Sequence, residues 1–160
     1  MKKFRIVIII LFMCPMICFG QKSEYFSFAF GYDLPSGGHG YGVTLTGNGM
    51  VVKGLYFGGG IGYTKFKNLS ISFIPLIANI TLIGNEKKIH PIIFLQPGYG
   101  VLNGNEETKG GFFFNGNVGI GFPGKVSPFL ALGYSRYAYT NFDLPISLSG
   151  FAMRAGIRLK

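Results

Sequence analysis

The sequence predicts an all-β protein that folds as an eight-stranded antiparallel up-and-down transmembrane β-barrel. The first observation is that aromatic and aliphatic residues alternate with small or polar residues in short runs, as over residues 54–63 and 111–120. This period of two is typical of strands with lipid on one side and a lumen on the other. The second is that charged residues make up 13% of the chain, about half of the ~25% usual in soluble domains. The third is that no apolar run after residue 20 reaches the ~18 residues of a membrane-spanning helix.

Residues 1–20 have the pattern of a secretory signal peptide. A basic start is followed by an apolar stretch over residues 6–13 and by small residues up to Gly20. That stretch is shorter than the ~20 residues of a spanning helix, which favours cleavage over a retained anchor. We expect cleavage between Gly20 and Gln21 and a single outer-membrane barrel domain over residues 21–160.

The composition of the mature domain excludes several kinds of site. Both cysteines, Cys14 and Cys18, lie in the leader, so no disulfide, thiolate metal site or cysteine nucleophile is available. Loss of Lys2, Lys3 and Arg5 lowers the formal charge from +9 to +6. Most of the remaining lysines lie at or near predicted turns, which we interpret as solvated turn charge and not as a nucleic-acid-binding surface. These are Lys53, Lys65, Lys67, Lys87, Lys88, Lys109 and Lys125.

The strands follow one another with turn residues between them. We expect strands over residues 24–33, 39–46, 50–64, 69–83, 90–102, 111–122, 127–137 and 146–159.

Short and longer connections are expected to alternate. Gly47-Asn48-Gly49 predicts a hairpin, because asparagine and glycine both tolerate positive φ. Residues 84–88 and Pro123-Gly124-Lys125 also predict short turns, and the other connections are somewhat longer and more polar. This alternation is typical of outer-membrane barrels, with short periplasmic turns and longer outer loops.

Two segments depart from a simple strand pattern. Residues 69–83 are almost continuously apolar, so a buried helix competes, but β-branched residues and Pro75 favour a strand. Pro75 and Pro97 both fall inside strands, where they cannot donate a backbone hydrogen bond. Each is eleven residues from Glu86 (86 − 75 and 97 − 86), so the two are expected nearly opposite each other, with a bulge or local widening there.

The face opposite the aromatic residues predicts a packed lumen. Eight strands enclose an interior that side chains can fill, and Arg154 is the inward charge. Because the first and last strands must meet to close the barrel, we expect Arg154 to pair with Glu24 or Asp33. Tyr63, Tyr99 and Tyr134 are expected to face lipid or its interfaces. The predicted inward set is Gly58, Gly60, Gly62, Gln96, Gly98, Gly100, Asn115, Asn117, Gly119, Ala131, Gly133 and Arg154.

One strand pair resembles a known family. The pair consists of residues 74–79 and 90–100, and the pattern of its second strand recurs at residues 127–134. This pattern resembles small outer-membrane β-barrel proteins of Bacteroidota, which are OmpA/OmpX-like members of the porin family. The resemblance implies an eight-stranded barrel in the outer membrane of a Gram-negative bacterium, exported through Sec, usually with no assigned molecular role. The closing strand over 146–159 resembles the signal that the barrel-assembly machinery reads, although the chain ends on Lys160 and not on an aromatic residue.

Little of the sequence predicts chemistry. Residues 119–124 match G-x-G-x-x-G, but a proline turn and a strand follow where a dinucleotide site needs a helix, so the match is due to chance. Some eight-stranded barrels modify lipid A, a hydrolase or acyltransferase reaction that needs His, Ser and a carboxylate together. Asp33, Ser36 and His39 are close in sequence at the outer rim, and we interpret His39 as an interfacial residue and not as part of a triad. His90 begins a later strand at a short turn.

The sequence therefore favours an integral outer-membrane barrel with a structural or surface-interaction role. Its expected partners are outer-membrane lipid and lipopolysaccharide, and the barrel-assembly machinery during biogenesis. We expect a monomer with no nucleic-acid partner and no catalytic, cofactor-binding or metal site. The alternatives are a lipid A-modifying barrel enzyme and a secreted lipocalin-like binder of a small ligand. A lipocalin would place its aromatic residues inward, whereas the opposite face here is Gly, Asn, Ser and Thr, which suits a lumen.

Overall fold

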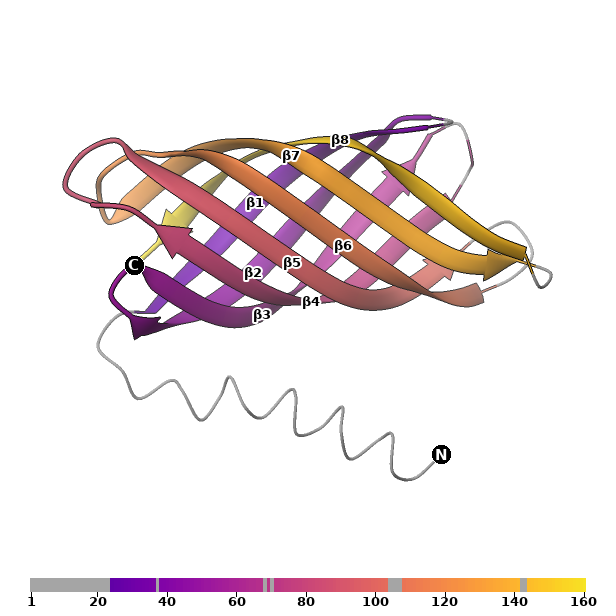
Figure 1. Ribbon diagram of the computed structural model, residues 1–160, viewed down its shortest axis with the longest axis horizontal. Helices are drawn as coiled ribbons and strands as arrows, with labels where there is room; N and C mark the ends of the chain where they lie inside the picture. Colours follow the sequence, from indigo (N-terminus) through magenta and orange to yellow (C-terminus); the bar gives the residue numbers. More distant parts are fainter. Residues whose placement is uncertain (1–23, 37, 68, 70, 104–107, 142–143) are drawn as a thin grey trace, which may run out of the picture.

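Eight antiparallel strands close into one barrel, as Figure 1 shows. The computed structural model describes residues 24–36, 38–67, 69, 71–103, 108–141 and 144–160, so the predicted signal peptide and its cleavage point lie outside the described residues. The predicted fold class is confirmed. The strands are β1 (Glu24–Pro35), β2 (Gly40–Val52), β3 (Leu55–Phe66), β4 (Ile71–Ile83), β5 (His90–Asn103), β6 (Thr108–Gly121), β7 (Val126–Asn141) and β8 (Leu144–Leu159).

Each strand pairs with its neighbours in the chain, and β1 pairs with β8 to close the barrel. The closing ladder runs without a shift from Phe26 opposite Leu159 to Pro35 opposite Gly150. No unpaired sheet edge is left, which is the arrangement that a barrel in lipid requires. Within the part of the chain that the structure describes, no helix has the length and hydropathy needed to cross a membrane.

The alternation in the sequence corresponds to the two faces of the barrel wall. In β1, Tyr25, Ser27 and Asp33 are buried inside, while Phe26 and Phe30 are more than half exposed outside. The same alternation holds for the predicted inward residues with side chains, all of which are buried: Gln96, Asn115, Asn117, Ala131 and Arg154. The ambiguous apolar segment forms β4, as predicted, and not a helix.

The predicted hairpin at Gly47-Asn48-Gly49 is wrong. β2 continues through these residues, pairing Gly47 with Phe26 of β1, and the chain turns at 53–54, where Gly54 has a φ of 84°. Asn48 is completely buried and its side chain bonds Asn79 of β4 and Thr46. Hydrogen bonds to distant strands therefore override the local turn preference of this tripeptide.

The expectation of a bulge or local widening at the two prolines is wrong for the bulge, but the pairing of β4 is interrupted beside Pro75 on the β3 side and beside Pro97 on the β5 side. Pro75 lies opposite Gly100 and Pro97 opposite Phe114, and the registers of both ladders continue unchanged on either side. A Cβ on Gly62 would lie 3.1 Å from the Pro75 ring, so the missing side chain leaves room for the ring without a change of register. The register shift in this barrel lies elsewhere, between Met50 and Val52 beside the β2–β3 turn.

The connections at the two ends do not differ in length as predicted. One end, here called the turn end, carries connections 53–54, 84–89 and 122–125 and the start of β1 and end of β8. The other, the loop end, carries connections 36–39, 67–70, 104–107 and 142–143.

β6, β7 and β8 extend past the apolar pattern into polar residues, because backbone pairing needs no apolar side chain.

Candidate functional site: an apolar belt around a polar lumen

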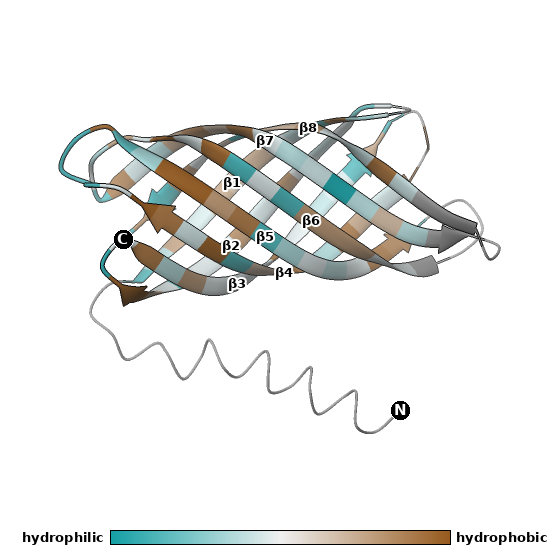
Figure 2. Cartoon of the chain, viewed as in Figure 1, coloured by the Kyte–Doolittle hydropathy of each residue, from teal (hydrophilic) through white to brown (hydrophobic). Residues whose placement is uncertain are grey.

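An apolar belt covers the outside of the barrel. Large apolar side chains point outward from all eight strands, and Figure 2 shows brown segments repeating along the wall. Tyr63, Tyr99 and Tyr134 point outward as predicted, with 41%, 63% and 49% of their surface exposed. Apolar area of this extent is far larger than the patches that soluble monomers expose. The belt is therefore the largest candidate interaction surface of the molecule.

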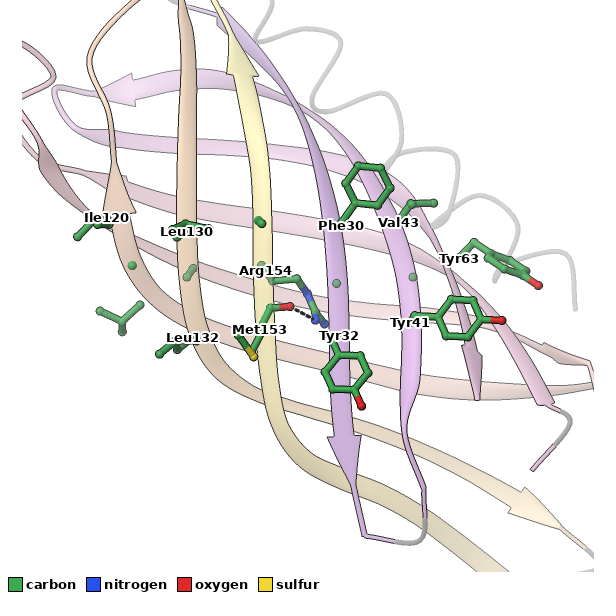
Figure 3. Close-up of a pocket in the computed structure, with 16 residues that line it drawn as sticks. Phe30, Tyr32, Tyr41, Val43, Tyr63, Ile120, Leu130, Leu132, Met153 and Arg154 are labelled. Carbon is green, nitrogen blue, oxygen red and sulfur yellow. Dashed lines mark hydrogen bonds between the residues drawn. The ribbon is translucent and has the colours of Figure 1, made fainter. Parts of the chain in front are cut away.

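A shallow hollow in this belt extends over strands from both sides of the β1–β8 seam. Figure 3 shows Phe30, Tyr32 and Tyr41 projecting from the outer wall on one side, and Leu130 and Leu132 on the other. Since these side chains belong to the outward set, the hollow is part of the belt, and inward residues such as Ala131 and Arg154 also contribute to its lining.

The lumen is closed at the loop end by an aromatic plug. Phe66, Phe73, Phe113 and Tyr137 pack together, with the Tyr137 ring centroid 4.9, 5.4 and 5.1 Å from those of Phe66, Phe73 and Phe113 respectively. The contacts with Phe66 and Phe73 are edge-to-face and that with Phe113 is tilted at 45°, and edge-to-face contacts at these distances are favourable beyond the burial of the rings. Three further buried aliphatic side chains surround the plug: Ile77, Leu102 and Leu148.

Beneath the plug lies a buried ion pair. Arg154 Nη2 donates to Asp33 Oδ1 at 2.8 Å, and the Tyr137 hydroxyl donates to Asp33 Oδ2, also at 2.8 Å. Arg154 is 7% exposed and Asp33 1%. The predicted pairing of Arg154 with Asp33 is confirmed, and the alternative with Glu24 is wrong because Glu24 begins β1 at the turn end. Gly31, opposite Arg154, leaves the space across which the guanidinium reaches Asp33.

Polar side chains fill the middle of the lumen. Asn115 Nδ2 donates to Gln96 Oε1 at 2.8 Å, and the hydroxyls of Ser27 and Thr46 are 2.6 Å apart. A cavity of about 10 Å³ lies beside Asn117, whose amide has no hydrogen-bond partner among the described residues. That volume holds about one water molecule, so this cavity is far smaller than an aqueous channel.

A second charged cluster closes the turn end. Arg158 is fully buried, and its Nη2 donates to Ser127 Oγ at 2.7 Å and to His90 Nε2 at 2.8 Å. His90 Nδ1 lies 2.7 Å from the backbone oxygen of Lys88, so the contacts assign the proton to Nδ1. Arg158 Nη1 also lies 3.8 Å from Glu86.

Lys160 completes this cluster through an ion pair with Glu86. Partial burial lowers the pKa of the Lys160 amine, whereas a neighbouring carboxylate favours the charged form. Sequence reasoning missed the cluster, because its members come from β5, β7, β8 and the turn over 84–89. Arg158 lies four residues after Arg154 on the same strand, so both side chains point to the same face. This spacing is the sequence signal that could have predicted a second inward arginine.

The structure does not assemble the candidate triad. The carboxylate of Asp33 points into the lumen toward Arg154 and Tyr137, Ser36 is exposed, and the His39 ring lies beside Tyr32 with centroids 6.3 Å apart. Among the described residues, no group of three His, Cys, Asp or Glu side chains could hold a metal ion. The G-x-G-x-x-G match at 119–124 lies at the end of β6, and β7 follows it.

Comparisons with known proteins are consistent with the fold. No family model matches the chain, and no curated protein sequence matches it. Among solved structures, the crystal structure of Neisserial surface protein A (NspA) is similar, with a TM-score of 0.60 at 13% identity. The match covers 86% of this chain and 95% of that one. A likeness at this identity concerns the fold, and it shows that the chain shares the closed eight-stranded barrel of that protein.

Proposed function

We propose that the chain is an integral outer-membrane β-barrel of a Gram-negative bacterium, with a packed lumen and a structural or surface-interaction role. The observation that carries the proposal is the inverted arrangement of the wall. Outward side chains are apolar on every strand, while Arg154, Arg158 and Asp33 are buried inside. Lipid solvates such a surface, whereas water would leave the belt exposed at a cost of ~25 cal/mol per Å².

The finer parts of the proposal rest on the sequence. Residues 1–20 direct export through Sec, and β8 is the segment that the barrel-assembly machinery reads. The chain would then be a monomer in contact with outer-membrane lipid and lipopolysaccharide. We place it with the OmpA/OmpX-like, porin-family barrels of Bacteroidota that it resembles. The barrel of a Neisserial surface protein is a further argument for a surface role.

The packed lumen supports a barrel that does not conduct. The aromatic plug covers one end, the Arg158 cluster covers the other, and the cavity between them has a volume of about 10 Å³. Neither alternative function has an observation in its favour. Asp33 is held by two other side chains and not by His39, and the cavity beside Asn117 has a volume of about 10 Å³, whereas a lipocalin-like binder needs a large apolar pocket inside the barrel.

Cell fractionation tests the location. The full chain is expressed in a Gram-negative host, and the outer-membrane fraction is run on a gel with and without boiling. A band in that fraction whose migration shifts on heating supports the proposal. A soluble periplasmic band contradicts it and favours the lipocalin-like alternative.

Planar-bilayer recording with the purified protein tests the lumen. The packed interior predicts no stepwise conductance, while regular steps would show an open channel.

A further inference from the structure

We propose that the turn end binds phosphate groups of an anionic lipid leaflet through a lysine ring, defined as Lys53, Lys87, Lys88 and Lys125. This inference rests on the proposed membrane location and adds to it a partner of stated chemistry. All four side chains are exposed. The turn end is at the left of Figures 1 and 2, and Figure 2 colours parts of the connections there teal, the colour of hydrophilic residues.

The ring surrounds the rim because every connection at this end contributes to it. Lys53 lies in the β2–β3 connection, Lys87 and Lys88 in the β4–β5 connection and Lys125 in the β6–β7 connection. Since neighbouring strands pair around a closed barrel, these three connections are spread around the circumference. The charges would therefore face the leaflet on all sides of the rim.

The nearest acid does not neutralise the ring. Glu86, the one acid in the three connections, is engaged by Lys160, by Arg158 at 3.8 Å and by the Tyr56 hydroxyl at 3.4 Å. Among the described residues, no ion pair joins a lysine of the ring to a carboxylate. The four ammonium groups are thus available to an external anion.

In each of the three connections, one lysine is next to an exposed aliphatic side chain. Val52 precedes Lys53, Ile89 follows Lys88 and Val126 follows Lys125, with exposed fractions of 57%, 63% and 56%. An aliphatic group next to an ammonium matches the boundary between acyl chains and headgroups. This pairing recurs in all three connections, which a ring of merely solvated lysines would not require.

The loop end differs from the turn end in the surroundings of its basic residues and in the number of acids in its connections. Of its basic residues, Lys65 and Lys67 are exposed, and Arg136 Nε donates to Ser147 Oγ at 3.1 Å. The connections there also contain three acids in the sequence: Glu106, Glu107 and Asp143. The turn end has two acids, Glu86 and Glu24 at the start of β1, against the four lysines of the ring, so the charge balance favours it as the anionic-lipid surface.

Lipid selectivity of the folded protein tests this inference. Full chain purified from the membrane is reconstituted in phosphatidylcholine vesicles, and electron paramagnetic resonance compares spin-labelled phosphatidylglycerol with spin-labelled phosphatidylcholine at the protein boundary. Each lysine near the surface contributes ~1 kcal/mol, which is about fivefold. We expect a several-fold preference for phosphatidylglycerol that falls toward one in about 1 M salt, where the Debye length is ~3 Å.

Matched variants assign the preference to the ring. The triple variant K53Q/K87Q/K125Q removes one lysine from each connection, leaves Lys88 as the last member of the ring, and should lower the preference most of the way to one. The control K65Q/K67Q/R136Q removes the same charge from the loop end and should keep it. An unchanged preference in the first variant, or an equal loss in both, overturns the inference.

The same samples separate this inference from the proposed function. Heat-shifted migration shows that each variant has folded, and exposed Lys→Gln changes rarely cost more than ~0.5 kcal/mol. A protein that inserts into vesicles without any lipid preference overturns only the lysine ring. A protein that does not insert overturns the membrane location as well.

Discussion

At the scale of single residues, the stability of the lumen depends on charges that are buried and paired. Removing one partner of a buried ion pair typically costs ~3–5 kcal/mol, whereas replacing both by apolar groups is often neutral. We expect Asp33→Ala to lower the free energy of unfolding by about that amount, since Arg154 would lose its carboxylate. The double variant D33A/R154M should recover most of the loss. Urea unfolding in vesicles measures both, and a double variant no more stable than the single one would contradict the argument.

The buried Arg158 can be compared with the exposed Arg136 for its contribution to stability. It is fully buried with partners on β5 and β7, while Arg136 is exposed and bonds Ser147. Hydrogen bonds to charged groups contribute ~1.5–3 kcal/mol each. Arg158→Met should therefore destabilise the barrel by about 2 kcal/mol or more, and Arg136→Met by less than ~0.5 kcal/mol. Equal effects in the same urea titration would show that the turn-end cluster contributes no stability.

At the scale of the strand, close packing depends on glycines that lack a Cβ. A Cβ on Gly58 of β3 would overlap the backbone carbonyl oxygen of Gly47 and lie 2.8 Å from the Cα of Asn48. A Cβ on the adjacent Gly59 would meet its nearest atom, the backbone oxygen of Ile77, at 3.4 Å. Gly58→Ala should therefore reduce the heat-shifted fraction, while Gly59→Ala should fold like the parent. Folding of Gly58→Ala at parental yield would mean that β2 and β3 can separate at small cost.

The strands also show which features of the fold could be predicted from the sequence. Strand parity predicted the inward set, and closure of the barrel predicted that Arg154 would pair with Glu24 or Asp33, because a period of two and the closure of the barrel are properties of the chain alone. Strand ends in β6, β7 and β8 were missed, because pairing continues where the apolar pattern stops. The Gly47-Asn48-Gly49 turn was wrong, because the hydrogen bonds that hold Asn48 come partly from β4. Long-range partners of this kind leave no local signal.

At the scale of the whole molecule, the barrel is apolar outside and charged inside, and this arrangement predicts how it tolerates a new charge. Arginine on a lipid-facing strand costs ~2–4 kcal/mol at the bilayer midplane and ~0–1 kcal/mol near an interface. Val126 and Leu132 of β7 are outward, 56% and 51% exposed, and six residues apart. At ~3.3 Å per residue and a tilt of ~40°, Leu132 lies about 15 Å deeper than Val126.

Leu132→Arg should therefore lower the free energy of unfolding in phosphatidylcholine vesicles by about 2–4 kcal/mol, whereas Val126→Arg should lower it by no more than ~1 kcal/mol. Both positions are aliphatic, outward and on one strand, so the difference isolates depth in the membrane from the loss of the side chain. Urea titration of the two variants beside the parent measures it. In water alone an outward arginine would cost little at either position, so equal and small losses would mean that the belt does not face lipid. A large loss confined to Leu132 would place the middle of β7 in the hydrocarbon core.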